Sequence, residues 1–402
     1  MNDRVREVDA PAECQPLSGP VPSPTPLPAQ HQPGSPIVRG VDWDAAGLAI
    51  LAELLTLGFG CFAFEVTSGQ RLRSLHQVFD IWNWWDTGQY VNIALHGYQK
   101  AGEMRWTIVF FPLYPWLVRM TAGLVRDTLI SAFIVSFLAS IVAAIALARL
   151  VAIDYPEPVA YRSVWFMFIF PTGYFLHIGY TESLFLALVI CSFLAARHDR
   201  WLAASILGAG AGLTRMNGLI LVPALGAEAA HRFWIERRWE SRWLWLGLIP
   251  CGFGIYLLIN YFVTGDPFTF AHYERSHWSQ GLGSPLDQIR QMAKVTGSND
   301  VYNARMIGLA ALFFLAAGLL ATAASFFTLR PSYSVWMAAN WLLIASLTWN
   351  LSAPRYGLAL FPIFILCARL ARSRNFYAVV TIGSLLLMGS FITSFLSDKW
   401  AF

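Results

Sequence analysis

Apolar runs of about twenty residues recur along the chain, separated by shorter polar segments. Helical runs of this length match the thickness of a bilayer, whereas the strands of a membrane barrel would alternate apolar and polar residues. The pattern therefore predicts an all-α polytopic membrane protein. Single apolar runs lie at about 45–66, 128–152, 161–178, 181–197, 243–263, 305–328, 333–350, 356–371 and 376–396.

The segment 201–230 is also apolar, but it is too long for one crossing. It reads WLAASILGAGAGLTRMNGLILVPALGAEAA, and the polar residues 214–217 stand in its middle. We expect two short helices that meet at a turn. With these two helices, the sequence predicts about eleven membrane spans.

Composition agrees with this class. The chain is 56% hydrophobic and only 13% charged, whereas a soluble domain averages about 25% charged residues. The net charge of +4 is small and no basic block with interleaved aromatics is present, which excludes a nucleic-acid-binding surface. The five cysteines have no metal-site spacing. We therefore expect neither a metal site nor a cofactor.

The first part of the chain, 1–42, is polar and rich in proline. Such a segment cannot bury a core, so we expect a disordered cytoplasmic tail followed by one membrane domain, 43–402. No apolar stretch follows the charges near Met1, which argues against a cleavable signal. The first apolar run is then the insertion signal.

Two long polar loops interrupt the membrane domain, at 67–127 and 264–304. The first contains the apolar stretch TIVFFPLYPWLVRM, which Pro112 and Pro115 break. Because proline ends or kinks a helix, this stretch suits helices lying at the membrane interface better than a straight span.

The distribution of arginine sets the orientation, since short cytoplasmic loops are enriched in basic residues. With the N-terminus inside, the short outer turns carry only Arg215 and Arg355, and Lys399 lies near the outer C-terminus. The inner connections then carry Arg149, Arg162, Arg197, Arg200, Arg232, Arg237, Arg238, Arg242, Arg330, Arg369, Arg372 and Arg374. This orientation depends on the segment 201–230 turning back.

The unusual polar motifs all fall on the outer face in this orientation. They are the carboxylates of the first loop, the residues 180–183, 214–217 and 353–356, and the second long loop. Because the orientation was derived from other residues, this convergence predicts a single site at the outer face.

The stretch FDIWNWWDTGQYVNIALHGY holds the first two carboxylates, Asp80 and Asp86, among Trp82, Trp84 and Trp85. Tryptophan favours the membrane–water boundary, where an ionised carboxylate in apolar surroundings is a candidate for function. We interpret Asp86 as a candidate catalytic base and Asp80 as a possible second carboxylate.

A structural role for Asp86 stays open. Asp86 precedes TGQYVNIALH and Gly97 follows it. Aspartate at the N-cap and glycine just past the C-terminus would frame a short helix without any chemistry. A capping residue can also be catalytic, so the two interpretations are not exclusive.

Arg215 and Arg355 each stand between two apolar helices with few acids nearby. An arginine at membrane depth is costly unless it is paired, and its planar fork suits a phosphate or carboxylate. The alternative is that each side chain snorkels to the interface. We expect both to bind an anionic substrate group.

Further polar residues are candidates for sugar or acceptor binding. Glu182 opens a span, where a carboxylate also favours the helix dipole. In the second long loop, GDPFTFAHYERSHWSQGLGSP, the residues His272, Glu274, Arg275 and His277 could bind an acceptor, with a solvated loop as the alternative. The candidate set for sugar and acceptor binding is Tyr180, Glu182, Asn217, His272 and Tyr356.

The motifs together resemble a known family. The chain shows WWDTGQYVNIALHGY, FFPLYPWLVR, GYTESLF, LTRMNGLIL and APRYGLALFP in order over about 45–371. This series is similar to the PIG-V-type mannosyltransferases, named for the enzyme that adds the second mannose of GPI anchors. Bacterial relatives carry the same motifs, so a GPI anchor is not implied.

The resemblance implies a GT-C fold, a site on the extracytoplasmic or lumenal side, and a polyprenyl- or dolichyl-phosphate mannose donor. By matching position, Asp86 would be the first-loop catalytic aspartate. The acceptor would be a hydroxyl of a lipid-linked or cell-envelope glycan, attacked with inversion. The membrane would be the bacterial plasma membrane or, in a eukaryote, the endoplasmic reticulum.

Alternative functions stay open. Within the enzymes, the alternatives are transfer of another lipid-linked sugar and an O-antigen ligase-like transferase. A lipid or glycolipid transporter without chemistry would show internal repeats and charged residues near the midplane. No convincing repeat is present, and the polar motifs gather on one face.

Overall fold

The computed structural model describes residues 36–348 and 350–402, and within these ranges the chain is helical and forms no sheet. The tail predicted over 1–42 lies mostly outside the described residues, but 36–42 already belong to the first helix. The helices are α1 (Pro36–Ser68), α2 (Leu75–Asp80), α3 (Asp86–His96), α4 (Leu113–Val125), α5 (Thr128–Ala152), α6 (Glu157–Phe168), α7 (Glu182–Arg197), α8 (Trp201–Thr214), α9 (Leu221–Glu236), α10 (Ile249–Thr264), α11 (Thr269–Ser276), α12 (Pro285–Thr296), α13 (Ala310–Thr328), α14 (Pro331–Ser346), α15 (Ala353–Tyr356), α16 (Pro362–Leu370) and α17 (Arg374–Leu396).

The predicted all-α membrane architecture is confirmed, but the number of spans is not. Among the described residues, 5 helices are long and apolar enough to cross a membrane, or up to 7 if each of two bent pairs counts as one span. Three of the helices are short for a membrane span: α7, α9 and α14 have 16 residues each. At 1.5 Å per residue such a helix is roughly 24 Å long, shorter than a hydrocarbon core of about 30 Å.

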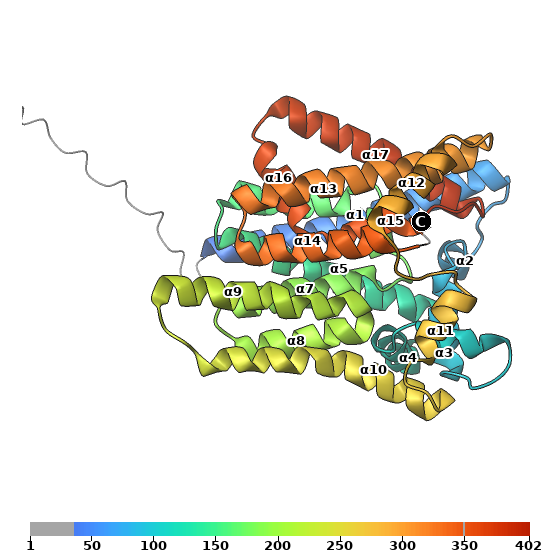
Figure 1. Ribbon diagram of the computed structural model, residues 1–402. Coiled ribbons are helices and arrows are strands. Elements are labelled where there is room, and N and C mark those ends of the chain that lie inside the picture. Colours follow the sequence, from blue (N-terminus) through green and yellow to red (C-terminus); the bar gives the residue numbers. More distant parts are fainter. Residues whose placement is uncertain (1–35, 349) are drawn as a thin grey trace, which may run out of the picture.

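The long helices run side by side, and the shorter outer-loop helices collect at one end of the bundle (Figure 1). The helix α5 is central to the bundle, since it packs against α1, α4, α6 and α7. Its buried positions are mostly alanine and serine, among them Ala132, Ser136, Ala143 and Ala144. Small side chains of this kind let helix backbones approach closely without lipid between them.

The chain reverses between α8 and α9, as the sequence predicts. Near the end of α9, Arg232 donates hydrogen bonds to the carbonyls of Ala196 and Arg197 and to Asp199, just before α8 begins. The turn itself passes close to α8, because a Cβ at Gly218 would lie 2.4 Å from the backbone nitrogen of Gly212. Only glycine fits at this point of the hairpin.

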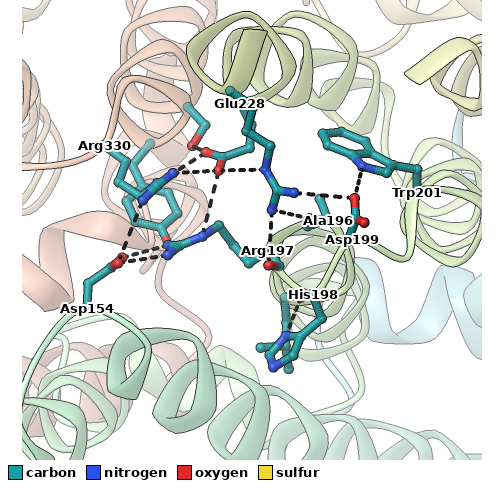
Figure 2. Close-up of polar contacts among 12 residues, drawn as sticks. Asp154, Ala196, Arg197, His198, Asp199, Trp201, Glu228 and Arg330 are labelled. Atoms are coloured by element: carbon teal, nitrogen blue, oxygen red, sulfur yellow. Dashed lines mark hydrogen bonds and ion pairs between the residues drawn. The ribbon is translucent and has the colours of Figure 1, made fainter. Parts of the chain in front are cut away.

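Ionic contacts join helix ends at the end of the bundle opposite the two long loops (Figures 1 and 2). Glu228 of α9, with a side chain only 1% exposed, accepts from Arg330 at 2.8 Å and from Ser332 at 2.7 Å. Arg197 of α7 donates to both carboxylate oxygens of Asp154, at 2.6 and 2.7 Å. These arginines were predicted only to set orientation, yet they also connect α7, α9 and the start of α14.

The first outer loop is folded onto the bundle. It contains α2, α3, the 3₁₀ segment η1 (Glu103–Val109) and α4, and η1 and α4 are bent by 113° at Pro112, as the prolines predict. Two tyrosine hydroxyls anchor it: Tyr114 donates to the carbonyl of Ala132 at 2.9 Å, and Tyr256 of α10 to that of Ile108 at 2.7 Å. The second outer loop contains α11 and α12.

Candidate active site

A cavity of about 440 Å³ opens among the helices of the two long loops and the adjacent ends of α7, α8 and α14. Its walls include Phe110, Phe111, Phe185 and Leu186, so much of the lining is apolar. Charged groups enter it from α3, α7, α11, α15 and the turn after α8. Of the predicted candidates, the cavity brings together Asp86, Glu182, Arg215, Asn217, Arg355 and Tyr356.

Asp86 meets Arg355 across this cavity. The Nη1 of Arg355 donates to Oδ2 of Asp86 at 2.8 Å, joining residues that are 269 positions apart. The Arg355 side chain is only 8% exposed. Its guanidinium also lies 5.4 Å from the ring centres of both Tyr180 and Tyr356, where the negative ring faces attract a cation.

Glu182 sits between the two arginines. Its Oε1 accepts from Nη1 of Arg215 at 2.6 Å and lies 3.4 Å from Nε of Arg355, and its side chain is 5% exposed. Arg215 also donates to the hydroxyl of Thr181 at 3.1 Å. Two carboxylates and two guanidinium groups therefore form one chain of contacts in which the charges balance.

The sequence around Asp86 explains how it is held. Trp82 is fully buried and packs so closely on α1 that a Cβ at Gly60 would lie 2.1 Å from its ring. This anchors the stretch before α3, whereas Trp84 and Trp85 stay partly exposed. The placement of Trp82 thus differs from the membrane-boundary position expected for the three tryptophans.

No capping contact of Asp86 is found among the described residues. Trp85, not Asp86, precedes the first helical residue of α3, and no side chain caps that end. The Asp86 carboxylate is instead bonded to Arg355. Gly97 does follow the helix with a φ of 72°, as the sequence predicts. The structure thus favours a cavity role for Asp86 over a cap.

Three predicted residues lie outside the cavity lining. Asp80 is exposed at the end of α2, and His272 is exposed on α11. Tyr180 is buried behind the site, where its hydroxyl donates to the carbonyl of Trp84 at 3.3 Å. It supports the loop before Asp86 and the guanidinium of Arg355, without lining the cavity.

Asn217 and Tyr356 do line it. The Nδ2 of Asn217 donates to Oδ1 of Asn340 at 3.0 Å, which fixes the turn after α8 to α14. The Tyr356 ring lies under both arginines, 5.5 Å from Arg215 and 5.4 Å from Arg355. Its hydroxyl accepts from Gln280 at 3.4 Å.

Of the polar residues that the sequence offers in the second long loop, Glu274 lines the cavity, whereas His272, the one preferred from the sequence, does not. Burial raises its pKa to about 7, and the negative charge of Asp86 adds to this effect. Residues two positions apart on a helix point to nearly opposite sides. If the loop had been predicted to be helical here, Glu274 would lie one turn after Phe270 on the same face of the helix. This is the face that packs on α10, since Phe270 contacts Phe253 and Tyr256.

Within 36–348 and 350–402, no group of three or more His, Cys, Asp or Glu side chains is arranged to hold a metal ion. The cavity lining supplies carboxylates, guanidinium groups, amides, hydroxyls and indole N–H groups. Such a set can bind an anion, accept a proton from a hydroxyl and hydrogen-bond a sugar.

Comparisons with known proteins give two sequence matches. Residues 111–258 match the family described as dolichyl-phosphate-mannose-protein mannosyltransferase. A stretch of 150 residues, 34% of this chain, is 30% identical to GPI alpha-1,6-mannosyltransferase 2 of Cricetulus griseus and covers 29% of it. The chain thus matches less than a third of the length of this curated relative.

Solved structures of the Archaeoglobus fulgidus oligosaccharyltransferase are also similar. The apo form gives a TM-score of 0.46 at 13% identity, covering 85% of this chain and 56% of that one. The complex with Zn and sulfate gives 0.44 at 14% identity, covering 78% and 49%. The two sequence matches and the helical membrane architecture support the predicted membership of this chain in a GT-C family of mannosyltransferases.

Proposed function

We propose that the protein is a membrane glycosyltransferase that moves mannose from a polyprenyl- or dolichyl-phosphate donor to a hydroxyl of a lipid-linked or cell-envelope glycan on the extracytoplasmic face. The observation that carries this proposal is the chain of contacts Asp86–Arg355–Glu182–Arg215 inside a cavity with apolar walls. A lipid-linked sugar phosphate has the matching parts: a sugar, one phosphodiester charge and an apolar tail.

The arginines are the proposed phosphate ligands. A guanidinium fork matches phosphate oxygens, and a cation placed where charge develops stabilises the departing group. Arg215 and Arg355 are held by a common partner, Glu182, so that both forks stay near one point. The apolar walls at Phe110 and Phe111 suit the first isoprene units of the lipid.

Asp86 is the proposed base. The acceptor hydroxyl oxygen bonds to C1 of the sugar while its proton passes to the Asp86 carboxylate. The C1–O bond to phosphate breaks, and its electron pair leaves on the phosphate oxygen. The products are an inverted glycoside and the lipid phosphate. Because a phosphate is a weak base, its departure needs cations rather than a proton donor.

A transporter is the competing class. It would place its charged residues near the midplane, at the interface of repeats. Here the charged cavity lies among the outer-loop elements and the outer helix ends, which favours an enzyme working on the outer face. Transfer of a different lipid-linked hexose, or an O-antigen ligase-like reaction, would use the same arrangement of groups. The membrane is the plasma membrane in a bacterium or the endoplasmic reticulum in a eukaryote.

Asp86→Asn tests the proposal, because asparagine keeps the shape but takes no proton at neutral pH. We expect the purified variant to bind the donor while transfer of labelled mannose from polyprenyl-phosphate mannose to membrane glycolipids falls by about 10²–10⁴. Asp80→Asn is the matched control, since Asp80 is in the same loop but exposed. Transfer by Asp86→Asn within a few-fold of the wild-type rate would remove Asp86 as the base.

A further inference from the structure

The cavity has a second group of lining residues besides the charged chain of contacts. It consists of three tryptophans and three polar side chains from α3 and the residue before it, α11, the loop after α11 and the C-terminal segment: Trp85, Gln89, Glu274, Trp278, Gln280 and Trp400. Indole faces pack on the C–H faces of sugars, and amide and carboxyl groups bond to hydroxyls. This composition suits a neutral carbohydrate better than a lipid tail.

Trp278 offers an unused hydrogen-bond donor beside the cavity. Its indole N–H is buried, and no hydrogen-bond acceptor in the described parts of the chain meets it. The ring itself is fixed edge to face on Phe110, with centroids 5.6 Å apart. Buried donors without a partner are rare, because each costs the loss of its bond to water. A hydroxyl oxygen of a bound sugar would supply the acceptor.

Trp85 has an unusual backbone conformation. It has φ 54° and ψ −117°, a conformation that L residues other than glycine seldom adopt. Its ring packs edge to face on that of Trp400, with centroids 5.0 Å apart, beside the cavity. Backbone strain of this kind is retained where the surroundings impose it and often marks a functional position. The strain here presents an indole directly before Asp86.

Glu274 supplies the polar centre of this group. Among the described residues, none hydrogen-bonds or ion-pairs with its carboxyl group, so it is available to a ligand. With a pKa of about 7, the group is largely protonated below neutral pH, when it both donates and accepts a hydrogen bond. The titratable groups on α3, η1, α10 and α11 besides Glu274 are Asp86, Tyr90, His96, Glu103, Arg105, Cys251, Tyr256, Tyr261, His272, Tyr273 and Arg275. Asp266 lies between α10 and α11, and His277 lies directly after α11.

We propose that Trp85, Glu274, Trp278 and their neighbours form a subsite for a neutral hexopyranosyl unit of the acceptor, with the uncharged Glu274 carboxyl bonding to a sugar hydroxyl. This proposal rests on the proposed function, since it assigns these residues to the acceptor and leaves the donor phosphate to the arginines. Ionisation of Glu274 removes the donated hydrogen bond and adds a second negative charge near Asp86. Binding of the sugar is therefore strong below about pH 7 and weak above it.

The test measures sugar binding without turnover. Full-length protein in nanodiscs, with no donor, is titrated with methyl α-D-mannopyranoside and methyl β-D-galactopyranoside and followed by saturation-transfer-difference NMR. If only the protonated form binds, a pKa near 7 makes wild-type affinity about tenfold lower at pH 8 than at pH 6. Glu274→Gln stays neutral and should bind equally at both pH values. Trp278→Phe keeps the ring but loses the N–H, and should weaken binding about two- to tenfold.

His272→Gln and His277→Gln are the controls, because these histidines lie on α11 and directly after it, and neither lines the cavity. Both should keep the wild-type pH dependence. No binding of either glycoside to the wild type at pH 6 overturns the subsite, as does a Glu274→Gln variant that keeps the wild-type pH dependence. Thermal melting of each variant confirms that it is folded. A fully active Asp86→Asn enzyme would overturn the proposed base and leave the binding result standing, so the two failures are distinguishable.

Discussion

Replacing Arg355 by lysine keeps the positive charge but removes the planar guanidinium group, so it tests whether the geometry of arginine is needed at this position. In the structure, Nη1 of Arg355 lies 2.8 Å from Asp86 and Nε lies 3.4 Å from Glu182, so one guanidinium contacts two carboxylates. A lysine ammonium keeps the charge but is too compact to span both carboxylates and a phosphate. A hydrogen bond to a charged group contributes about 1.5–3 kcal/mol. Loss of one such contact to the donor phosphate should therefore lower kcat/KM about ten- to hundredfold.

The assay is mannose transfer from labelled polyprenyl-phosphate mannose at varied donor concentration, with Arg355→Lys purified beside Arg275→Lys. Arg275 is exposed on α11 and serves as a matched outer-face control that should behave as the wild type. Thermal melting shows whether the variant is folded. An Arg355→Lys enzyme with unchanged donor dependence would refute the reasoning, and it would leave Arg355 as a structural partner of Asp86 and Glu182.

Two further predictions concern the rest of the bundle. A single cysteine at 275 should be labelled from outside the membrane and one at 237 only from inside, and labelling of 275 from the cytoplasm would contradict the orientation. Glu228→Gln removes a charge that is only 1% exposed and is bonded to Arg330, so it should lower the free energy of unfolding by about 3 kcal/mol or more while donor affinity stays unchanged. A Glu228→Gln protein that melts like the wild type would show that this inner-side contact is not a stabilising one.

The grouping of the site residues was predictable because membrane depth makes polar side chains costly. An arginine between two apolar runs must find an anion, and few acids were available on the same face. The turn within 201–230 was equally predictable, because a polar break in the middle of a thirty-residue apolar segment leaves two stretches that are each long enough for a short helix. These inferences use only the chain's order and the thickness of a bilayer, and the contact of Arg355 with Asp86 agrees with them.

Other features depend on packing that the order of residues does not give. The helices α6 and α16 are shorter than the apolar runs 161–178 and 356–371 suggested, with 12 and 9 residues. The local pattern at Asp86 is that of a helix cap, yet a partner 269 positions away decides where its carboxylate points. Glu274 and His272 are equally polar in sequence, and only the side of α11 that packs on η1 and α10 distinguishes them.

The balance of charge in the cavity couples the two halves of the proposed reaction. Asp86, Glu182, Arg215 and Arg355 sum to zero, so an anionic donor must compete with carboxylates for the guanidinium forks. When the acceptor proton reaches Asp86, that carboxylate becomes neutral and its attraction for Arg355 weakens. The guanidinium charge then acts on the phosphate oxygen at the moment when the electron pair arrives there. Proton transfer from the acceptor hydroxyl to Asp86 thus strengthens the stabilisation of the departing phosphate, and Arg355 is the side chain that connects the two events. An isolated base or an isolated cation would lack this coupling, which gives a chemical reason for the direct contact between Asp86 and Arg355.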